Sequence, residues 1–167
     1  MRKDIVGSCA LLIVVALLIV RPWEGNVGEE GPAAATALVT RVVDGDTVEA
    51  RIGDEVEDVR LIGVDTPETV KPGEPVQCFG PRASSFTHRL LEGRRVRLVF
   101  GVERRDVYGR LLAYAYLGER FFNAQLVRRG LARTLTIPPN DRFAPLLRRL
   151  ELAAARAGRG LWDGCPP

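Results

Sequence analysis

The alternation of apolar and polar residues along the middle of the chain predicts a mainly β domain. Residues 47–52 and 56–64 alternate as half-buried strands do, and the Asp44-Gly45 pair before the first of them is typical of a tight hairpin turn. In all, five runs have the composition and spacing of strands: 41–43, 47–52, 56–64, 96–100 and 110–116.

Apolar residues at helical spacing predict three helices. The first begins at Gly80-Pro81, where proline costs no hydrogen bond, and ends near Gly93. The second, through 129, is expected to be capped by Asn123, and the third covers 143–157. Five strands before and between three helices predict an α+β, mainly β domain built on a small Greek-key barrel.

The amino-terminal residues 1–21 read as a signal-anchor or a signal peptide. Arg2-Lys3 precedes sixteen small or apolar residues, 5–20. This length falls between the stretch of about 7–15 residues of a secretory signal and the span of about 20 residues of a membrane helix. We expect an uncleaved signal-anchor, with a cleaved signal peptide as the alternative. In either case the domain is expected outside the cytoplasm, membrane-anchored or secreted.

Residues 22–36 mix Pro, Gly, Ala and Glu without periodicity and predict a flexible linker. The remaining residues, 37–167, form the predicted domain. We find no internal repeat in the sequence.

Charge is unevenly distributed along the domain. Residues 36–81 contain ten acidic and four basic residues, whereas residues 82–167 contain seventeen arginines and seven acidic residues. A basic half suits a polyanionic partner such as nucleic acid. The alternative is that the arginines reflect genome composition, because lysine is nearly absent.

Four charged residues are expected to converge. Asp46 opens one predicted strand, Arg60 lies within the next, and Asp65 and Glu68 follow its end, so an antiparallel meander would bring them within a few ångströms of each other. Two aspartates plus a carbonyl suit a hard cation such as Ca²⁺, a further carboxylate can act on a water, and an arginine can bind a phosphate. The plainer alternative is that these residues only form turns. Histidine-based catalysis is not expected, because the one histidine, His88, lies on a predicted helix.

Three motifs in this order resemble those of the staphylococcal nuclease (thermonuclease) family: Asp44-Gly45-Asp46-Thr47-Val48, residues 60–69, and Tyr108-Gly109-Arg110. The resemblance extends from about Val39 to Trp162 and implies a five-stranded OB-fold barrel with three helices, preceded here by the hydrophobic segment.

The resemblance also implies roles for individual residues. Asp46, Asp65 and the Thr66 carbonyl would hold Ca²⁺. Glu68 would act as the base-like residue, Arg60 and Arg110 would contact the scissile phosphate, and Tyr108 would contact the substrate.

The implied activity is that of a monomeric Ca²⁺-dependent endonuclease acting on DNA and RNA, with single strands preferred, which leaves 3′-phosphate ends. The alternative is a non-catalytic OB-fold module that binds nucleic acid or a protein. The catalytic alternative is favoured because this sequence keeps the acidic and arginine positions of the family motifs: Asp46, Arg60, Asp65, Glu68 and Arg110.

The sequence departs from the family at two places. Val107 stands where the family has a lysine before its Tyr-Gly-Arg motif. The loop 131–140, where staphylococcal nuclease has tyrosines beside the bound nucleotide, contains no aromatic residue and is one position shorter.

Cys78 and Cys165 are candidates for a disulfide bond. An oxidising compartment favours disulfides, and a bond between these positions would join the carboxy-terminal tail to the barrel. The alternative is two unrelated free thiols.

Overall fold

The computed structural model describes residues 33–69, 73 and 75–165. The predicted signal segment 1–21 and most of the predicted linker therefore lie outside the described residues. In the described part of the chain, no helix is long and apolar enough to cross a membrane.

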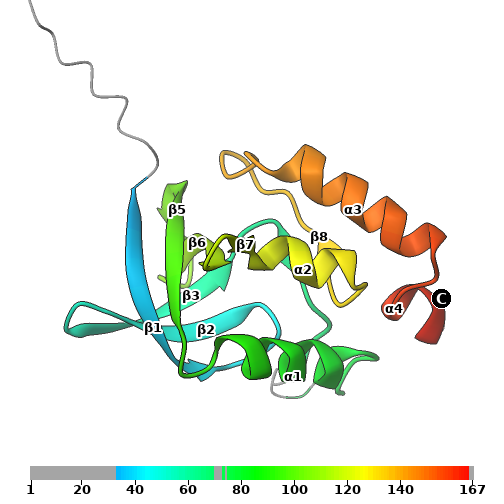
Figure 1. Cartoon of the computed structure of the whole chain (residues 1–167), viewed down its shortest axis with the longest axis horizontal. Helices are drawn as coiled ribbons and strands as arrows, with labels where there is room; N and C mark the ends of the chain where they lie inside the picture. The colour runs from blue at the N-terminus through cyan, green and yellow to red at the C-terminus, as the bar shows by residue number, and fades with distance from the viewer. Residues whose placement is uncertain (1–32, 70–72, 74, 166–167) are drawn as a thin grey trace, which may run out of the picture.

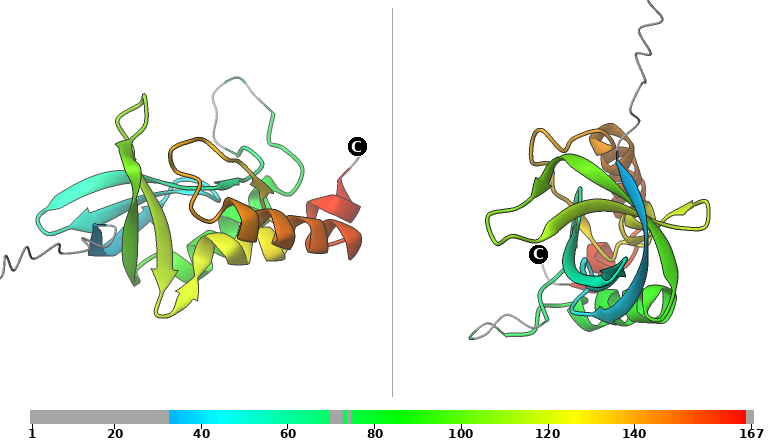
Figure 2. Two further views of the ribbon diagram at one scale, coloured as in Figure 1. Left: turned by 90° about the horizontal axis from the view of Figure 1, so that it is seen from above. Right: turned by 90° about the vertical axis from the view of Figure 1, so that its left-hand side faces the viewer.

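The described residues form eight strands: β1 (Ala34–Val42), β2 (Thr47–Ile52), β3 (Glu55–Leu61), β4 (Val64–Asp65), β5 (Arg95–Arg105), β6 (Leu111–Leu117), β7 (Arg120–Phe121) and β8 (Arg133–Thr134). Five of them lie in the order β3-β2-β1-β5-β6, with antiparallel neighbours, and a parallel pairing of β3 with β6 closes the barrel (Figures 1 and 2). The predicted five-stranded OB-fold barrel is confirmed. The short β7 extends the β6 edge, and β4 pairs with β8.

β1 is longer than the predicted strand 41–43. It begins at Ala34, inside the stretch 22–36 that we expected to be linker, because its first half pairs with β5. Its second half pairs with β2, and an irregularity in register lies between Val39 and Arg41. One bent strand thus pairs with two neighbouring strands. Such bends are typical of sharply curved barrels. A run of small residues carries no local signal for such pairing.

In the part of the chain that the structure describes, four helices accompany the barrel: α1 (Gly80–Leu91), α2 (Phe122–Arg128), α3 (Ala144–Arg156) and the one-turn α4 (Leu161–Gly164). The first three correspond to the three predicted helices. α1 begins with Pro81 in its first turn and buries Ala83, Phe86 and Thr87. In Figure 1, α2 lies between α1 and α3.

Asn123 does not cap α2, contrary to our expectation, because the helix begins one residue earlier, at Phe122. The Asn123 side chain is fully buried instead. Its amide N–H donates to the Ile62 carbonyl (2.8 Å) and its Oδ1 accepts from the Ala115 N–H (3.0 Å). Asn123 therefore fastens α2 to the turn that follows β3, next to the predicted site.

Glu151 is a buried acid that secures the loop after α2. Its carboxylate accepts hydrogen bonds from the Thr134 N–H and hydroxyl (2.9 and 2.8 Å) and from Arg148 (2.6 Å). Burial alone would raise the pKa of Glu151, but the hydrogen bonds from Thr134 and Arg148 outweigh it and lower this pKa.

Cys78 and Cys165 form a disulfide bond, with their Cα atoms 5.8 Å apart. The bond joins the segment before α1 to the end of α4, which are 87 residues apart in sequence. The alternative of two free thiols is therefore not what the structure shows.

The disulfide is expected to contribute substantially to stability. Cys78→Ser should lower the free energy of unfolding by about 2–5 kcal/mol, the usual loss for a native disulfide. Urea unfolding of the oxidised chain and the variant measures the difference. Reduced wild-type protein and the Cys78→Ser/Cys165→Ser double variant are controls that should match the single variant. Equal stability of oxidised and reduced wild-type protein would contradict this expectation.

Glu151 should make stability depend on pH. Because its pKa is lower in the folded protein than in the unfolded chain, its contribution is complete above the unfolded value of about 4.5. That contribution should be lost as pH falls through the folded pKa. Urea unfolding between neutral and acidic pH should show wild type losing more stability than Glu151→Gln, and parallel curves would contradict the assignment.

Candidate active site

One end of the barrel brings Asp46 and Arg60 into contact across neighbouring strands. Thr47, the first residue of β2, pairs with Arg60 of β3, and the Leu61 N–H donates to the Asp46 carbonyl (2.8 Å). The Arg60 guanidinium lies 2.5 Å from Asp46 Oδ1 and donates to Asp65 Oδ1 (2.9 Å). Arg60 therefore lies between the two carboxylates, one from the turn before β2 and the other from the end of β4.

Asp46 is held by more than this ion pair. It is 4% exposed, and its Oδ2 accepts hydrogen bonds from the Thr66 N–H (2.6 Å) and the Thr66 hydroxyl (2.9 Å). A buried carboxylate needs such partners, because removing it from water is costly. The same contacts fix the turn 65–66 against the start of β2.

The turn before Asp46 is fixed from both sides. A Cβ on Gly45 would lie 2.7 Å from the Thr66 side chain, so only glycine allows this approach. From α1, the buried Thr87 hydroxyl donates to the Gly45 carbonyl (2.6 Å). The helix thus positions the Asp46 turn directly, although Thr87 is 42 residues away in sequence.

Negative charge is crowded at this end of the barrel. Asp44 accepts a hydrogen bond from the Asp46 N–H (3.0 Å). Burial and the charge of Asp46 raise the pKa of Asp44 to about 6. Burial also raises the pKa of Asp65, with Arg60 opposing and the charges of Asp46 and Glu68 adding to the rise. The carboxyl groups of Asp44, Asp46 and Asp65 together outnumber the one positive charge of Arg60.

A second cationic group approaches from the hairpin between β5 and β6. Arg110 donates to Asp106 Oδ2 from Nε and lies 2.7 Å from it through Nη2. Asp106 also accepts from the backbone N–H groups of Tyr108 and Arg110, both at 3.0 Å. The Arg110 guanidinium lies 5.3 Å from the centroid of the Tyr108 ring. The turn therefore presents Tyr108, which is 81% exposed, beside a fixed arginine.

Arg60, Tyr108 and Arg110 line one cavity of about 300 Å³. Its lining also includes Leu135 and Ile137, from the loop that follows β8, and both are exposed. Two acidic residues, Glu103 and Asp106, line it as well, and Asp106 is paired with Arg110. An anion entering this cavity would meet the guanidinium groups of Arg60 and Arg110 and the phenol of Tyr108. Arginine is well suited to phosphate, because its planar fork can donate two parallel hydrogen bonds.

Glu68 lies in the segment after β4, on the Asp65 side of the site. It is half-buried, its Oε1 accepts from the Thr69 N–H (2.8 Å), and its own N–H donates to the Gln77 side chain (3.0 Å). Its charge contributes to the raised pKa of Asp65. The structure thus brings Asp46, Arg60, Asp65 and Thr66 into direct contact and places Tyr108 and Arg110 around the cavity that Arg60 lines. Glu68 is near enough to Asp65 for its charge to act on that carboxyl group.

Three residues of this site were not predicted as part of it: Asp44, Thr87 and Asp106. Asp44 and Asp106 each accept a hydrogen bond from the N–H two residues ahead, a common aspartate turn that the sequence could have indicated. Thr87 carries no such signal, because its partner lies on another element.

A cation site with three or more acidic, histidine or cysteine residues is not found among residues 33–69, 73 and 75–165. The expected donor set is smaller: two carboxylates, from Asp46 and Asp65, and the Thr66 carbonyl. These are oxygen ligands only, which suit a hard cation. Asp44 lies beside these ligands as a further carboxyl group, and burial, with the charge of Asp46 adding to it, raises the pKa of Asp44 to about 6.

Comparison with known proteins is consistent with these features. A family model described as "Staphylococcal nuclease homologue" matches residues 58–164. A thermonuclease of Staphylococcus intermedius is 41% identical over 171 residues, covering 98% of this chain and 99% of the relative. A thermonuclease of Staphylococcus hyicus is 39% identical over 172 residues with the same coverage. An SPbeta prophage-derived endonuclease of Bacillus subtilis is 36% identical over 125 residues, 74% of this chain and 42% of the relative.

Proposed function

Because this chain belongs to the staphylococcal nuclease family and is a hydrolase of the nuclease class, we propose that it is a Ca²⁺-dependent endonuclease that cleaves DNA and RNA. It would hydrolyse phosphodiester bonds and leave 3′-phosphate ends. The observation that supports this most directly is the cavity lined by Arg60 and Arg110, each guanidinium already oriented by a carboxylate. A non-catalytic OB-fold module would not need this arrangement.

The cation would be held by Asp46, Asp65 and the carbonyl of Thr66. Bound there, Ca²⁺ would polarise a phosphoryl oxygen and help to position the attacking water. Asp46 contributes a carboxylate whose orientation Thr66 already fixes. The chain therefore supplies a rigid ligand before any cation arrives.

Arg60 and Arg110 would bind the phosphoryl oxygens of the scissile group. Negative charge on these oxygens increases as water attacks phosphorus and the 5′-oxygen leaves. Donors that are already oriented stabilise this charge without reorganising, which is usually the largest single catalytic contribution. Asp106 orients Arg110, while Asp46 and Asp65 orient Arg60.

Glu68 would orient the attacking water or accept its proton. Glu68 is near enough to Asp65 for its charge to add to the raised pKa of Asp65, which supports a place for Glu68 beside the proposed cation. Tyr108 projects into solvent beside Arg110 and would contact a phosphate or sugar of the substrate.

The wider setting of the enzyme is part of the same proposal. The Cys78–Cys165 disulfide supports a location outside the cytoplasm, because such bonds persist in oxidising compartments. We propose that the chain acts there as a monomer, membrane-anchored or secreted, with single strands as preferred substrates, since their phosphates turn more freely toward a cavity.

Digestion of single-stranded DNA, with Ca²⁺ or with a chelator, tests this function. Wild-type protein should digest the polymer only when Ca²⁺ is present. Asp46→Ala should lower the rate of digestion and should also weaken Ca²⁺ binding, which calorimetry measures.

Glu68→Gln should retain Ca²⁺ binding while lowering the rate of digestion by about 10²–10⁴-fold, as expected for loss of a group that moves a proton. Digestion that persists in chelator, or a normal rate for Glu68→Gln, would contradict the respective assignment.

The apolar lining at Leu135 and Ile137 leads to a further expectation about affinity. Neither side chain offers the stacking on an aromatic ring that is worth about 1–3 kcal/mol per base. A 3′,5′-bisphosphate nucleotide should therefore bind weakly in the presence of Ca²⁺, although long polymers are cleaved.

Leu135→Tyr places an aromatic ring in this lining and should tighten nucleotide binding by about 5–150-fold, the equivalent of one stacked base. Val102→Tyr, an exposed position outside the cavity lining, is the matched control. Tight binding by the wild-type chain would show that other side chains replace the missing tyrosines.

A further inference from the structure

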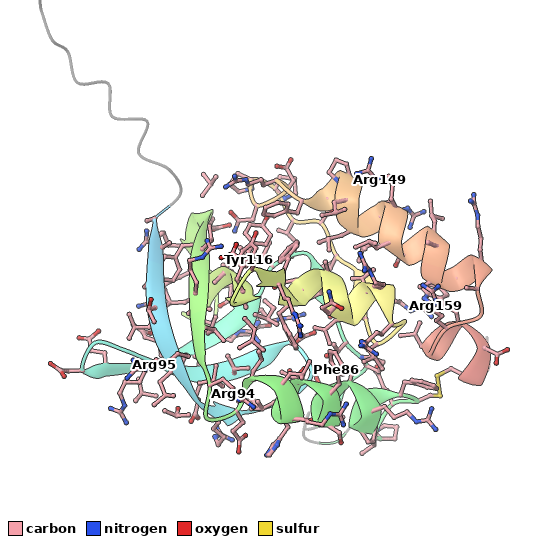
Figure 3. The ribbon with its side chains drawn as sticks, viewed as in Figure 1. Phe86, Arg94, Arg95, Tyr116, Arg149 and Arg159 are labelled. Carbon is pink, nitrogen blue, oxygen red and sulfur yellow. A yellow bond between two sulfur atoms is a disulfide. The ribbon has the colours of Figure 1, made fainter. Side chains whose placement is uncertain are left out.

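A groove between α1 and α2 carries arginines that have no part in the candidate active site. It consists of two adjoining hollows, both of which include Phe86, Arg89 and Arg129. Arg82 belongs to one hollow and Arg120 to the other. Figure 3 shows Phe86 on the side of α1 that faces α2. We call this surface, with Arg82, Arg89, Arg120 and Arg129, the α1–α2 arginine groove.

The groove lies on the face opposite the candidate active site. The left panel of Figure 2 shows the hairpin between β5 and β6, which carries Tyr108, on one side of the molecule and α2 on the other. The two surfaces are therefore separate, and the groove cannot hold the same phosphate that Arg60 and Arg110 contact.

The floor of the groove is aromatic and closed. The rings of Phe86 and Phe122 stack with centroids 5.8 Å apart, and they are 6% and 2% exposed. Buried rings of this kind cannot stack on a base. A ligand in this groove would instead be bound by the charged groups at its rim, without regard to base identity.

The rim consists of oriented arginines. The guanidinium carbons of Arg89 and Arg129 lie 5.8 and 5.0 Å from the Phe86 centroid, and that of Arg82 lies 4.7 Å from the Phe79 centroid. An aromatic face attracts the planar cation and leaves its N–H groups available to an anion. The rim therefore presents donors whose arrangement is partly fixed before binding.

The positive charge of the rim is not neutralised by the protein. All four arginines are exposed, and none forms an ion pair within the described part of the chain. Over those same residues, the lining of the two hollows includes no aspartate or glutamate. Arg60 and Arg110 differ in this respect, because each is paired with a carboxylate.

We propose that the α1–α2 arginine groove binds the sugar-phosphate backbone of single-stranded nucleic acid as a second substrate site. Four neighbouring unpaired guanidinium groups match a chain of phosphates in charge, and counterions released from the strand favour the contact. The identity of the strand rests on the proposed function: it is the polymer cleaved on the opposite face, part of which the groove retains. Binding there is independent of sequence.

Binding measured without cleavage tests this proposal. Full-length protein in a nonionic detergent is titrated into a long fluorescent oligothymidylate with a chelator present, at several salt concentrations. Arg89→Gln/Arg129→Gln should weaken binding on the order of tenfold at low salt. It should also reduce the slope of log affinity against log salt by about 1.4, because each contact with a single strand contributes about 0.7.

The matched control is Arg149→Gln/Arg156→Gln, which removes the same charge from exposed positions on α3 (Figure 3 labels Arg149). For this control variant, the slope of log affinity against log salt should equal that of the wild type. Arg82→Gln/Arg120→Gln removes two groove arginines without touching Phe86, so it gives the answer if the first pair fails to fold.

Two results would overturn the proposal. One is an equal reduction of the salt-dependence slope in the groove and control variants, which would mean that only the total charge of the protein determines its affinity for the strand. The other is an unchanged slope for DNA together with lost binding to vesicles of anionic phospholipid, which would assign the groove to a membrane surface. Because the assay contains chelator, failure of Ca²⁺-dependent digestion would contradict the proposed function and leave this result intact.

Discussion

The rest of the site depends on the hydrogen bonds and the ion pair that the buried carboxylate of Asp46 forms. It accepts two hydrogen bonds from Thr66 and pairs with Arg60, so the start of β2, the end of β3 and the turn after β4 meet at one side chain. Such a group is tolerated in the interior only because every partner is in place. The Thr87 hydroxyl holds the same turn from α1, so barrel and helix position the site together.

The same arrangement concentrates negative charge. Asp44, Asp46 and Asp65 lie around a single arginine, and burial together with mutual repulsion raises the pKa of Asp44. Without a cation, this crowding opposes folding at neutral pH. A site that must attract a metal ion is expected to conflict with stability in this way. The Cys78–Cys165 disulfide and the buried Glu151 lie on other elements and stabilise the fold independently of it.

Arginines serve two different purposes in this molecule. Near the barrel end they are paired with carboxylates, which sets the direction of each guanidinium. Between α1 and α2 they are stacked on aromatic rings and have no carboxylate partner in the described residues. In the functions that we propose, a paired arginine contacts one phosphate, whereas unpaired ones contribute a field that acts along a whole strand. Six of the arginines thus lie on two separate surfaces.

Local patterns in the sequence determined most elements and the placement of the site on them. The alternation of residues 47–52, the turn at Asp44-Gly45 and the proline at the start of α1 each depend on near neighbours, so they could be read directly. The resemblance of three motifs predicted the site residues, of which Asp46, Arg60, Asp65 and Thr66 are in contact in the structure. Only the tertiary structure decided the closure of the barrel by β3 and β6, the use of Asn123 as a buried link, and the meeting of Arg89 and Arg129 over one ring. These depend on contacts between segments far apart in the chain, where burial and pairing, not local propensity, select the partner.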